Sequence, residues 1–194
     1  MPIPGYMETI ATSQVDGPAL ASFTTAVSCL PTPARHTIAP DDWYLGKRLW
    51  ISAQGRIGNV VTAAPTFTFQ FMLGPTSNII AFTTGAILCS TTAHTTLPFW
   101  LDIMLTCRAM GSGTSANLIG QARAMSRAFV DVSGADVTTI GHPDLLVPET
   151  NPAVGTGFDS NVANIADLFV ACSASNAANT VQVTQYSLVD MGGG

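Results

Sequence analysis

The sequence predicts an all-β fold, either an antiparallel β-sandwich or a jelly roll. Three segments, residues 47–57, 66–73 and 99–108, alternate between apolar and polar side chains with a period of two. This period is typical of half-buried antiparallel strands, because successive side chains on a strand point to opposite faces. The expected inner face of the second segment is the clearest and carries Phe67, Phe69, Phe71 and Leu73. Since no helical crossovers separate these segments, we expect two packed sheets.

The N-terminal part of the chain, residues 1–42, has a different composition from the rest. It contains six prolines: Pro2, Pro4, Pro18, Pro31, Pro33 and Pro40. Proline at this density disfavours helix, so we predict an extended arm with one strand at 20–29. The jelly-roll domain is then expected over residues 43–190, followed by a flexible Gly-rich tail at 191–194.

The remaining strands of the domain are less regular in sequence. Residues 79–88 are apolar without clear alternation, as in a strand covered on both faces, whereas 165–173 and 180–189 alternate again. Residues 118–129 fit both a helix and a strand, and Gly120 together with the all-strand context favours the strand. These elements bring the expected number to seven to nine strands. Residues 131–158 are rich in Pro, Gly, Asp and Thr and are expected to form a long loop.

Composition restricts the classes of function. The chain has 194 residues, of which 47% are hydrophobic and 10% charged, with a formal net charge of −5 and one lysine, Lys47. Soluble domains average about 25% charged residues, so this surface is expected to be partly covered by other molecules. A nucleic-acid partner would need a basic patch, which is missing. The apolar stretches are too short for a membrane span, and the first residues do not resemble a signal peptide.

Residues that could perform chemistry are scattered along the sequence. No nucleophile is placed beside a base by a known motif, although His36, His94 and His142 are present and Asp102 or Asp167 could complete a triad on paper. Two groups of possible metal ligands, His36 with Asp41 and Asp42, and Asp131 with Asp136, His142 and Asp144, lack EF-hand spacing. The Gly-rich segment 111–115 lacks a P-loop lysine. We therefore expect no enzyme activity, no cofactor and no metal.

The four cysteines, Cys29, Cys89, Cys107 and Cys172, are far apart in the sequence and form no CxxC pair. Neither a disulfide framework nor a zinc site is supported by this spacing. We expect reduced cysteines that pack in the core.

Several large apolar residues fall on the faces of strands that are otherwise polar. They are Trp50, Met72, Trp100, Met104 and Met125. Such residues would form an exposed patch on a monomer, whereas aromatic residues, Met and Arg are enriched in interfaces. These five residues are the candidate subunit interface, for example in a trimer; a second layer such as the folded-back arm would also bury them.

Three stretches resemble jelly-roll structural proteins of tailed bacteriophages. They are YLGKRLWISAQGRIGNVVTAAPTFTFQFMLG (44–74), TTLPFWLDIMLTCRAMGSGTSANLIGQARAMS (95–126) and the closing FVACSASNAANTVQVTQYSLVDM. The resemblance covers residues 43–190. It implies a barrel similar in form to the C1q and tumour-necrosis-factor trimers, and it carries over no catalytic residues.

The resemblance implies a structural role in the virion, assembled in the host cytoplasm. The leading expectation is a homotrimeric capsid decoration (cement) protein that reinforces a phage head and contacts the major capsid protein of the shell through its N-terminal arm. The alternatives are a receptor-recognition module at a tail or fibre tip and, less favoured, a major capsid protein built from a single jelly roll.

Overall fold

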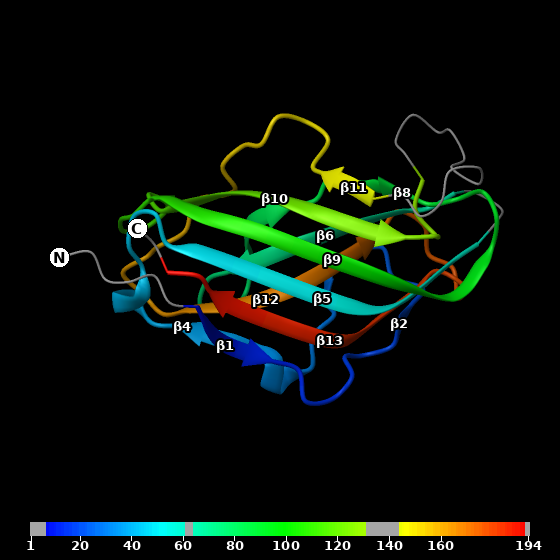
Figure 1. Ribbon diagram of the computed structural model, residues 1–194, viewed down its shortest axis with the longest axis horizontal. Coiled ribbons are helices and arrows are strands. Elements are labelled where there is room, and N and C mark those ends of the chain that lie inside the picture. The colour runs from blue at the N-terminus through cyan, green and yellow to red at the C-terminus, as the bar shows by residue number, and fades with distance from the viewer. Residues whose placement is uncertain (1–6, 61–63, 131–143, 193–194) are drawn as a thin grey trace.

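The computed structural model describes residues 7–60, 64–130 and 144–192 of the chain. They form two antiparallel β-sheets packed face to face, so the all-β prediction is confirmed (Figure 1). Within the described residues, the helical elements are two short 3₁₀ turns, η1 (Thr32–Ala34) and η2 (Pro40–Asp42), each with a proline in its first turn. The arrangement is that of a β-sandwich.

The larger sheet has seven strands and contains the longest elements of the molecule. Its order is β1-β13-β5-β9-β10-β11, and β2 also pairs with β13. The bounds are β1 Glu8–Thr12, β2 Leu20–Ala21, β5 Arg48–Asn59, β9 His94–Ala109, β10 Asn117–Ser126, β11 Asp144–Val147 and β13 Thr180–Asp190. The ambiguous segment 118–129 is therefore a strand, β10, up to Ser126.

The smaller sheet has six strands with the order β3-β12-β6-β7, while β4 also pairs with β12 and β8 with β6. The bounds are β3 Val27–Ser28, β4 His36–Ile38, β6 Thr66–Leu73, β7 Ile79–Thr83, β8 Ile87–Leu88 and β12 Asn164–Cys172. The single strand expected at 79–88 is interrupted between β7 and β8, where Gly85 has a φ of 70°.

The core lies between the two sheets and is built from the predicted inner faces. Phe67, Phe69 and Phe71 of β6 are fully buried. Phe69 stacks on Phe99 of the opposite sheet, with ring centroids 5.6 Å apart. The alternation in the sequence therefore identified the correct face of these strands.

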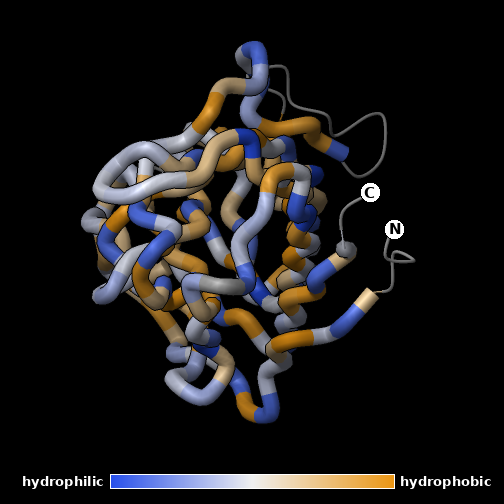
Figure 2. Tube along the Cα trace, turned by 90° about the vertical axis from the view of Figure 1, so that its left-hand side faces the viewer, coloured by the Kyte–Doolittle hydropathy of each residue, from blue (hydrophilic) through white to orange (hydrophobic). Residues whose placement is uncertain are grey.

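The N-terminal segment, defined here as residues 7–42, lies along one side of the sandwich. Its strands β1 and β2 pair with β13 of the larger sheet, and β3 and β4 pair with β12 of the smaller one. Cys29, Leu30 and Ile38 are at most 1% exposed and belong to the core. Where the sequence predicted an extended arm, these residues close the side of the sandwich; residues 1–6 lie outside the described part. The ends of the described chain, β1 and β13, lie side by side (Figure 2).

The opposite side of the sandwich is closed by residues 154–158, which fall within the predicted long loop. The amide of Gly155 donates to the carbonyl of Leu118 in the larger sheet, at 2.9 Å. The next amide, of Thr156, donates to Ile80 in the smaller sheet, also at 2.9 Å. Residues 131–143 of the expected loop lie outside the described residues, and 144–147 form β11. Of the expected tail, Met191 and Gly192 are hydrogen-bonded to the domain, and 193–194 lie outside the described residues.

Candidate functional site

The outer face of the seven-stranded sheet is an open surface of the molecule. Figure 1 looks onto it: no described segment crosses in front of β13, β5, β9 and β10. Four of the five predicted interface residues lie on this face, but in two separate places. The structure thus divides the predicted interface into an apolar row, a groove and one residue elsewhere.

The apolar row is defined as Val189, Trp50 and Met104, which lie opposite one another on neighbouring strands. Trp50 of β5 pairs with Met104 of β9 on one side and with Val189 of β13 on the other. Trp50 and Met104 are partly exposed, while Val189 is 6% exposed. Cross-strand neighbours on one face contact each other, so the row forms a continuous apolar strip across three strands.

Met72 does not join this face, contrary to the sequence prediction. It lies in β6 of the other sheet, between Asp167 of β12 and Ile80 of β7, and is 7% exposed. The grouping failed because alternation along a strand shows which residues face away from the core, but not which of two sheets the strand belongs to.

Trp100 and Met125 line a groove at the end of the face where β10 ends. Trp100 pairs with Gln54 on one side and with Met125 on the other, and is 41% exposed. The groove, called here the Trp100 groove, has a volume of about 410 Å³. Its other lining residues are Gln54, Gly55, Pro98, Phe99, Ser126, Arg127, Thr184 and Gln185.

A β-bulge in β13 supplies two of the polar groove residues. The register between β13 and β5 shifts between Val183, opposite Gly55, and Gln185, opposite Gln54. The extra residue, Thr184, is partly exposed and Gln185 is exposed, while Val183 and Tyr186 on either side are buried. Bulges re-aim side chains in this way. The groove was not predicted from the sequence, although the spacing of the apolar residues Val183 and Tyr186, three residues apart where alternation requires an even number, indicates a bulge.

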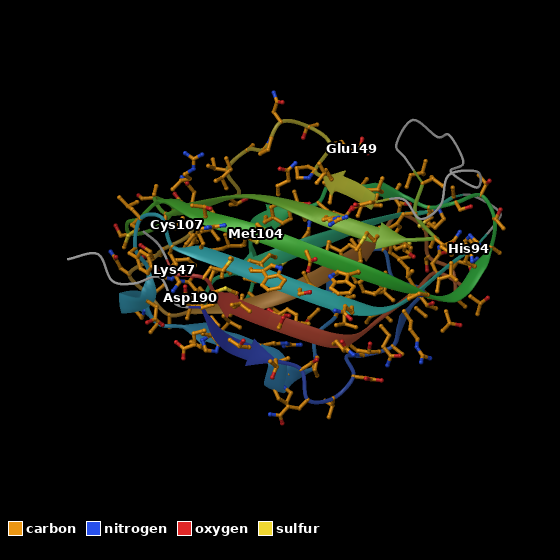
Figure 3. The ribbon with its side chains drawn as sticks, in the orientation of Figure 1. Lys47, His94, Met104, Cys107, Glu149 and Asp190 are labelled. Carbon is orange, nitrogen blue, oxygen red and sulfur yellow. The ribbon has the colours of Figure 1, made fainter. Side chains whose placement is uncertain are left out.

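A buried ion pair occupies the opposite end of the same sheet. Lys47 is 4% exposed, its Nζ atom contacts Asp190 Oδ2, and it lies 5.3 Å from the centroid of the Tyr44 ring. Burial raises the pKa of the neighbouring Cys107 thiol. Figure 3 shows Lys47, Cys107 and Asp190 together at this end and His94 at the other. With both charges paired and the thiol protonated, the cluster fixes the ends of β5 and β13 and is not a nucleophilic site.

A second ion pair holds the N-terminal segment to the smaller sheet. Arg35 Nε lies 3.1 Å from Asp167 Oδ2, and the Ser28 hydroxyl donates to Asp167 Oδ1 at 2.8 Å. Asp167 is 1% exposed, and burial raises its pKa despite these partners. The Asp167 carboxylate is thus committed to Arg35 and Ser28 and not to a histidine.

The other candidates for chemistry are likewise dispersed. His36 lies in β4 and His94 at the start of β9, while His142, Asp131 and Asp136 lie outside the described residues. Asp144 pairs with Arg123, which lowers the pKa of that carboxyl group. In the described part of the chain, no three His, Cys, Asp or Glu side chains are grouped as metal ligands.

The predicted state of the cysteines is confirmed, since all four are free and buried. Burial raises the pKa of each thiol, most strongly at Cys29 and Cys89. A thiol must be deprotonated to act as a nucleophile or a metal ligand, so these cysteines serve as core residues.

The Gly-rich segment 111–115 is the turn between β9 and β10. Its amides are already engaged: Gly111 donates to the Ser160 hydroxyl at 2.9 Å, and Gly113 donates to the Asp159 carboxylate at 2.8 Å. A carboxylate therefore occupies one of the donors that a phosphate would need.

Comparison with known proteins adds no relative: no family model, no curated protein and no solved structure matches the chain. Among the described residues, no helix has the length and apolar character required to cross a bilayer.

Proposed function

We propose that the chain is a non-enzymatic structural subunit of a bacteriophage virion, a jelly-roll decoration protein that assembles as a homotrimer and reinforces the shell. The observation that carries the proposal is the open outer face of the seven-stranded sheet, with its apolar row of Val189, Trp50 and Met104. The resemblance of residues 43–190 to tailed-phage structural proteins supplies the biological setting.

The size of this face suits a subunit contact. Four strands spaced about 4.8 Å apart, with ten residues rising about 3.3 Å each, span about 600 Å². Standard protein–protein interfaces bury about 800 Å² on each partner. A contact over the end of the face that holds the row, extended onto the loops beside that end, would therefore approach the usual size and leave the other end of the face open.

The cations of the surface also fit an assembling subunit. The single lysine is buried against Asp190, so every exposed Lys or Arg side chain that the structure describes is an arginine. Arg48 is exposed and lies on the same face as the row, two residues before Trp50 on β5. Interfaces are enriched in Arg, Trp and Met and depleted of Lys.

In this proposal the N-terminal segment contacts the major capsid protein of the shell. Val15 is 58% exposed and Met7 56%, so the outward side of the segment offers apolar atoms to a neighbour while its inner side packs on the core. Many weak contacts repeated by the symmetry of a shell add up through avidity.

Light scattering coupled to size-exclusion chromatography tests the assembly. The wild type is expected to elute as a trimer of 20.2 kDa chains, and Trp50→Ser with Met104→Ser is expected to shift it to monomer. Val162→Ser is the matched control, because Val162 is also an exposed apolar residue (38%) but lies in the turn before β12. A wild type that stays monomeric at micromolar concentration would overturn the trimer.

The copy number in purified particles tests the location. A number that matches the shell lattice is expected for a decoration protein, with density for the chain on the outside of the shell in electron micrographs. A few copies at the tail would instead support the receptor-recognition alternative and overturn the decoration role.

A further inference from the structure

We propose that the Trp100 groove is a binding site for an acidic saccharide, a pyranose ring that carries a carboxylate. The proposal rests on the side chains that line the groove and not on the assembly through the apolar row. Met104 and Trp100 are four residues apart along β9, about 13 Å at the usual strand rise, so the row and the groove are separable by mutation.

The apolar part of the groove suits the face of a sugar ring. Trp100 is 41% exposed, although it lies on a strand with partners on both sides, and Met125 flanks it. An indole ring offers a flat, electron-rich surface, on which the C–H groups of a pyranose can lie. The volume of about 410 Å³ is within the range of small-ligand sites.

The polar part supplies hydrogen-bonding groups that are still free. The side chains of Gln54 and Gln185 form no hydrogen bond with any other residue that the structure describes, and the bulge in β13 directs Gln185 to this face. Each carboxamide has both donors and an acceptor, which matches adjacent hydroxyl groups on a sugar. The Thr184 hydroxyl donates to the Gln54 backbone carbonyl at 3.4 Å. This hydrogen bond is long, so a ligand can replace it.

The charge of the groove selects an anionic ligand. Arg127 lines it, is exposed, and has no ion pair within the described residues. No Asp or Glu lines the groove. Two carboxylates flank it in the sheet: Asp144, opposite Met125, is paired with Arg123, and Asp102, two residues beyond Trp100 on β9, also lies opposite Arg123. A guanidinium group binds a carboxylate through two parallel hydrogen bonds, so a uronic or sialic acid fits better than a neutral hexose.

Titration of the full chain with glucuronic acid and N-acetylneuraminic acid tests the site. Binding is measured by saturation-transfer NMR and by tryptophan fluorescence, and glucose is the neutral comparator. Saturable binding at millimolar concentration is expected for the acids. Trp100→Ala is expected to weaken it about tenfold or more. Arg127→Gln is expected to remove the preference for the acids over glucose. Val162→Ala, at an exposed apolar residue in the turn before β12 that belongs to neither the groove nor the apolar row, is the matched control and should bind like the wild type.

Three results would overturn the proposal. The first is no binding of either acid by wild-type protein, and the second is equal binding by Trp100→Ala when its circular dichroism spectrum is native. The third is a change of oligomeric state in Trp100→Ala, which would show that the groove belongs to the subunit contact. Failure of the trimer test above would leave the saccharide measurement intact, so the two proposals can fail separately.

Discussion

Asp167 is a buried carboxyl group at the side of the sandwich, and its surroundings shift its pKa. The Asp167 carboxylate accepts a hydrogen bond from the Ser28 hydroxyl and forms an ion pair with the Arg35 guanidinium. Because the residue is only 1% exposed, however, the carboxylate has lost most of its hydration. Because desolvation outweighs both partners, the pKa of Asp167 lies above its ordinary value of 3.8. The folded protein therefore binds this proton more tightly than the unfolded chain does.

This pKa shift predicts a pH dependence of stability. A raised pKa contributes stability that is fully present below the ordinary value of 3.8 and is lost as the pH rises through the raised pKa. The free energy of unfolding of the wild type, relative to Asp167→Asn, should therefore decrease from about pH 4 upward. Urea unfolding across that range measures it, with the exposed Asp16→Asn as control. A difference that is constant or rises with pH would contradict the prediction.

At the scale of elements, the N-terminal segment closes one side of the sandwich. Its residues Cys29, Leu30 and Ile38 are core residues, and its strands β3 and β4 cover the edge of β12. Covering strand edges removes unpaired backbone groups that would otherwise recruit other chains. If the segment contacts a shell as proposed, that contact would use its outward side, because releasing the segment would open the core.

Removal of the segment is accordingly expected to unfold the protein. Deletion of residues 1–42 should give an aggregating or unfolded chain by circular dichroism. Gly17→Ala is a milder test of the packing of this segment. A Cβ atom there would collide with the carbonyl oxygen of Cys29, so the free energy of unfolding should fall by about 1–3 kcal/mol. Val15→Ala, two residues away and 58% exposed in the wild type, should change stability little. A folded, soluble deletion variant would contradict this role.

The elements differ in how far the sequence could predict them. The strands β5, β6 and β9 were evident because their alternation is local and regular. The N-terminal strands were not, since Ser28 meets Asp167 from 139 residues away and prolines break up the pattern. The strand expected at 20–29 is two short pairings, β2 and β3, with Ser22 at a φ of 56° between them.

The candidate site shows the same limit. Alternation correctly identified Trp50, Trp100, Met104 and Met125 as facing away from the core, but it could not separate the row from the groove or exclude Met72. Those distinctions depend on the pairing of strands and on the bulge in β13, which are properties of the assembled sheet.

For the molecule as a whole, the two closed sides should make the sheets one folding unit. The N-terminal segment bonds to both β13 and β12, and the amides of Gly155 and Thr156 bond to both sheets on the other side. Neither sheet can therefore open without breaking bonds at both sides of the sandwich.

Unfolding is accordingly expected to be a single transition. Urea curves measured by far-ultraviolet circular dichroism and by tryptophan fluorescence should coincide, as in a two-state domain. Trp43 is 3% exposed, and the centroid of its ring lies 4.8 Å from that of Phe158. Its fluorescence therefore reports on the side of the sandwich that residues 154–158 close. With Trp50→Phe and Trp100→Phe in place, its fluorescence should follow the same curve. Separate midpoints for the two signals would contradict a single unit.

The burial of Lys47 has a consequence for the chemistry of the surface. With this side chain buried against Asp190 of β13, the folded domain offers solvent no side-chain amine. Reagents and enzymes directed at lysine, such as succinimidyl esters, aldehyde fixatives and ubiquitin ligases, find no target among the side chains of the native molecule. On a particle coated with such subunits, the exposed cationic Lys and Arg side chains in the described part of each subunit would all be arginines, and amine-directed reagents would find no lysine there to modify.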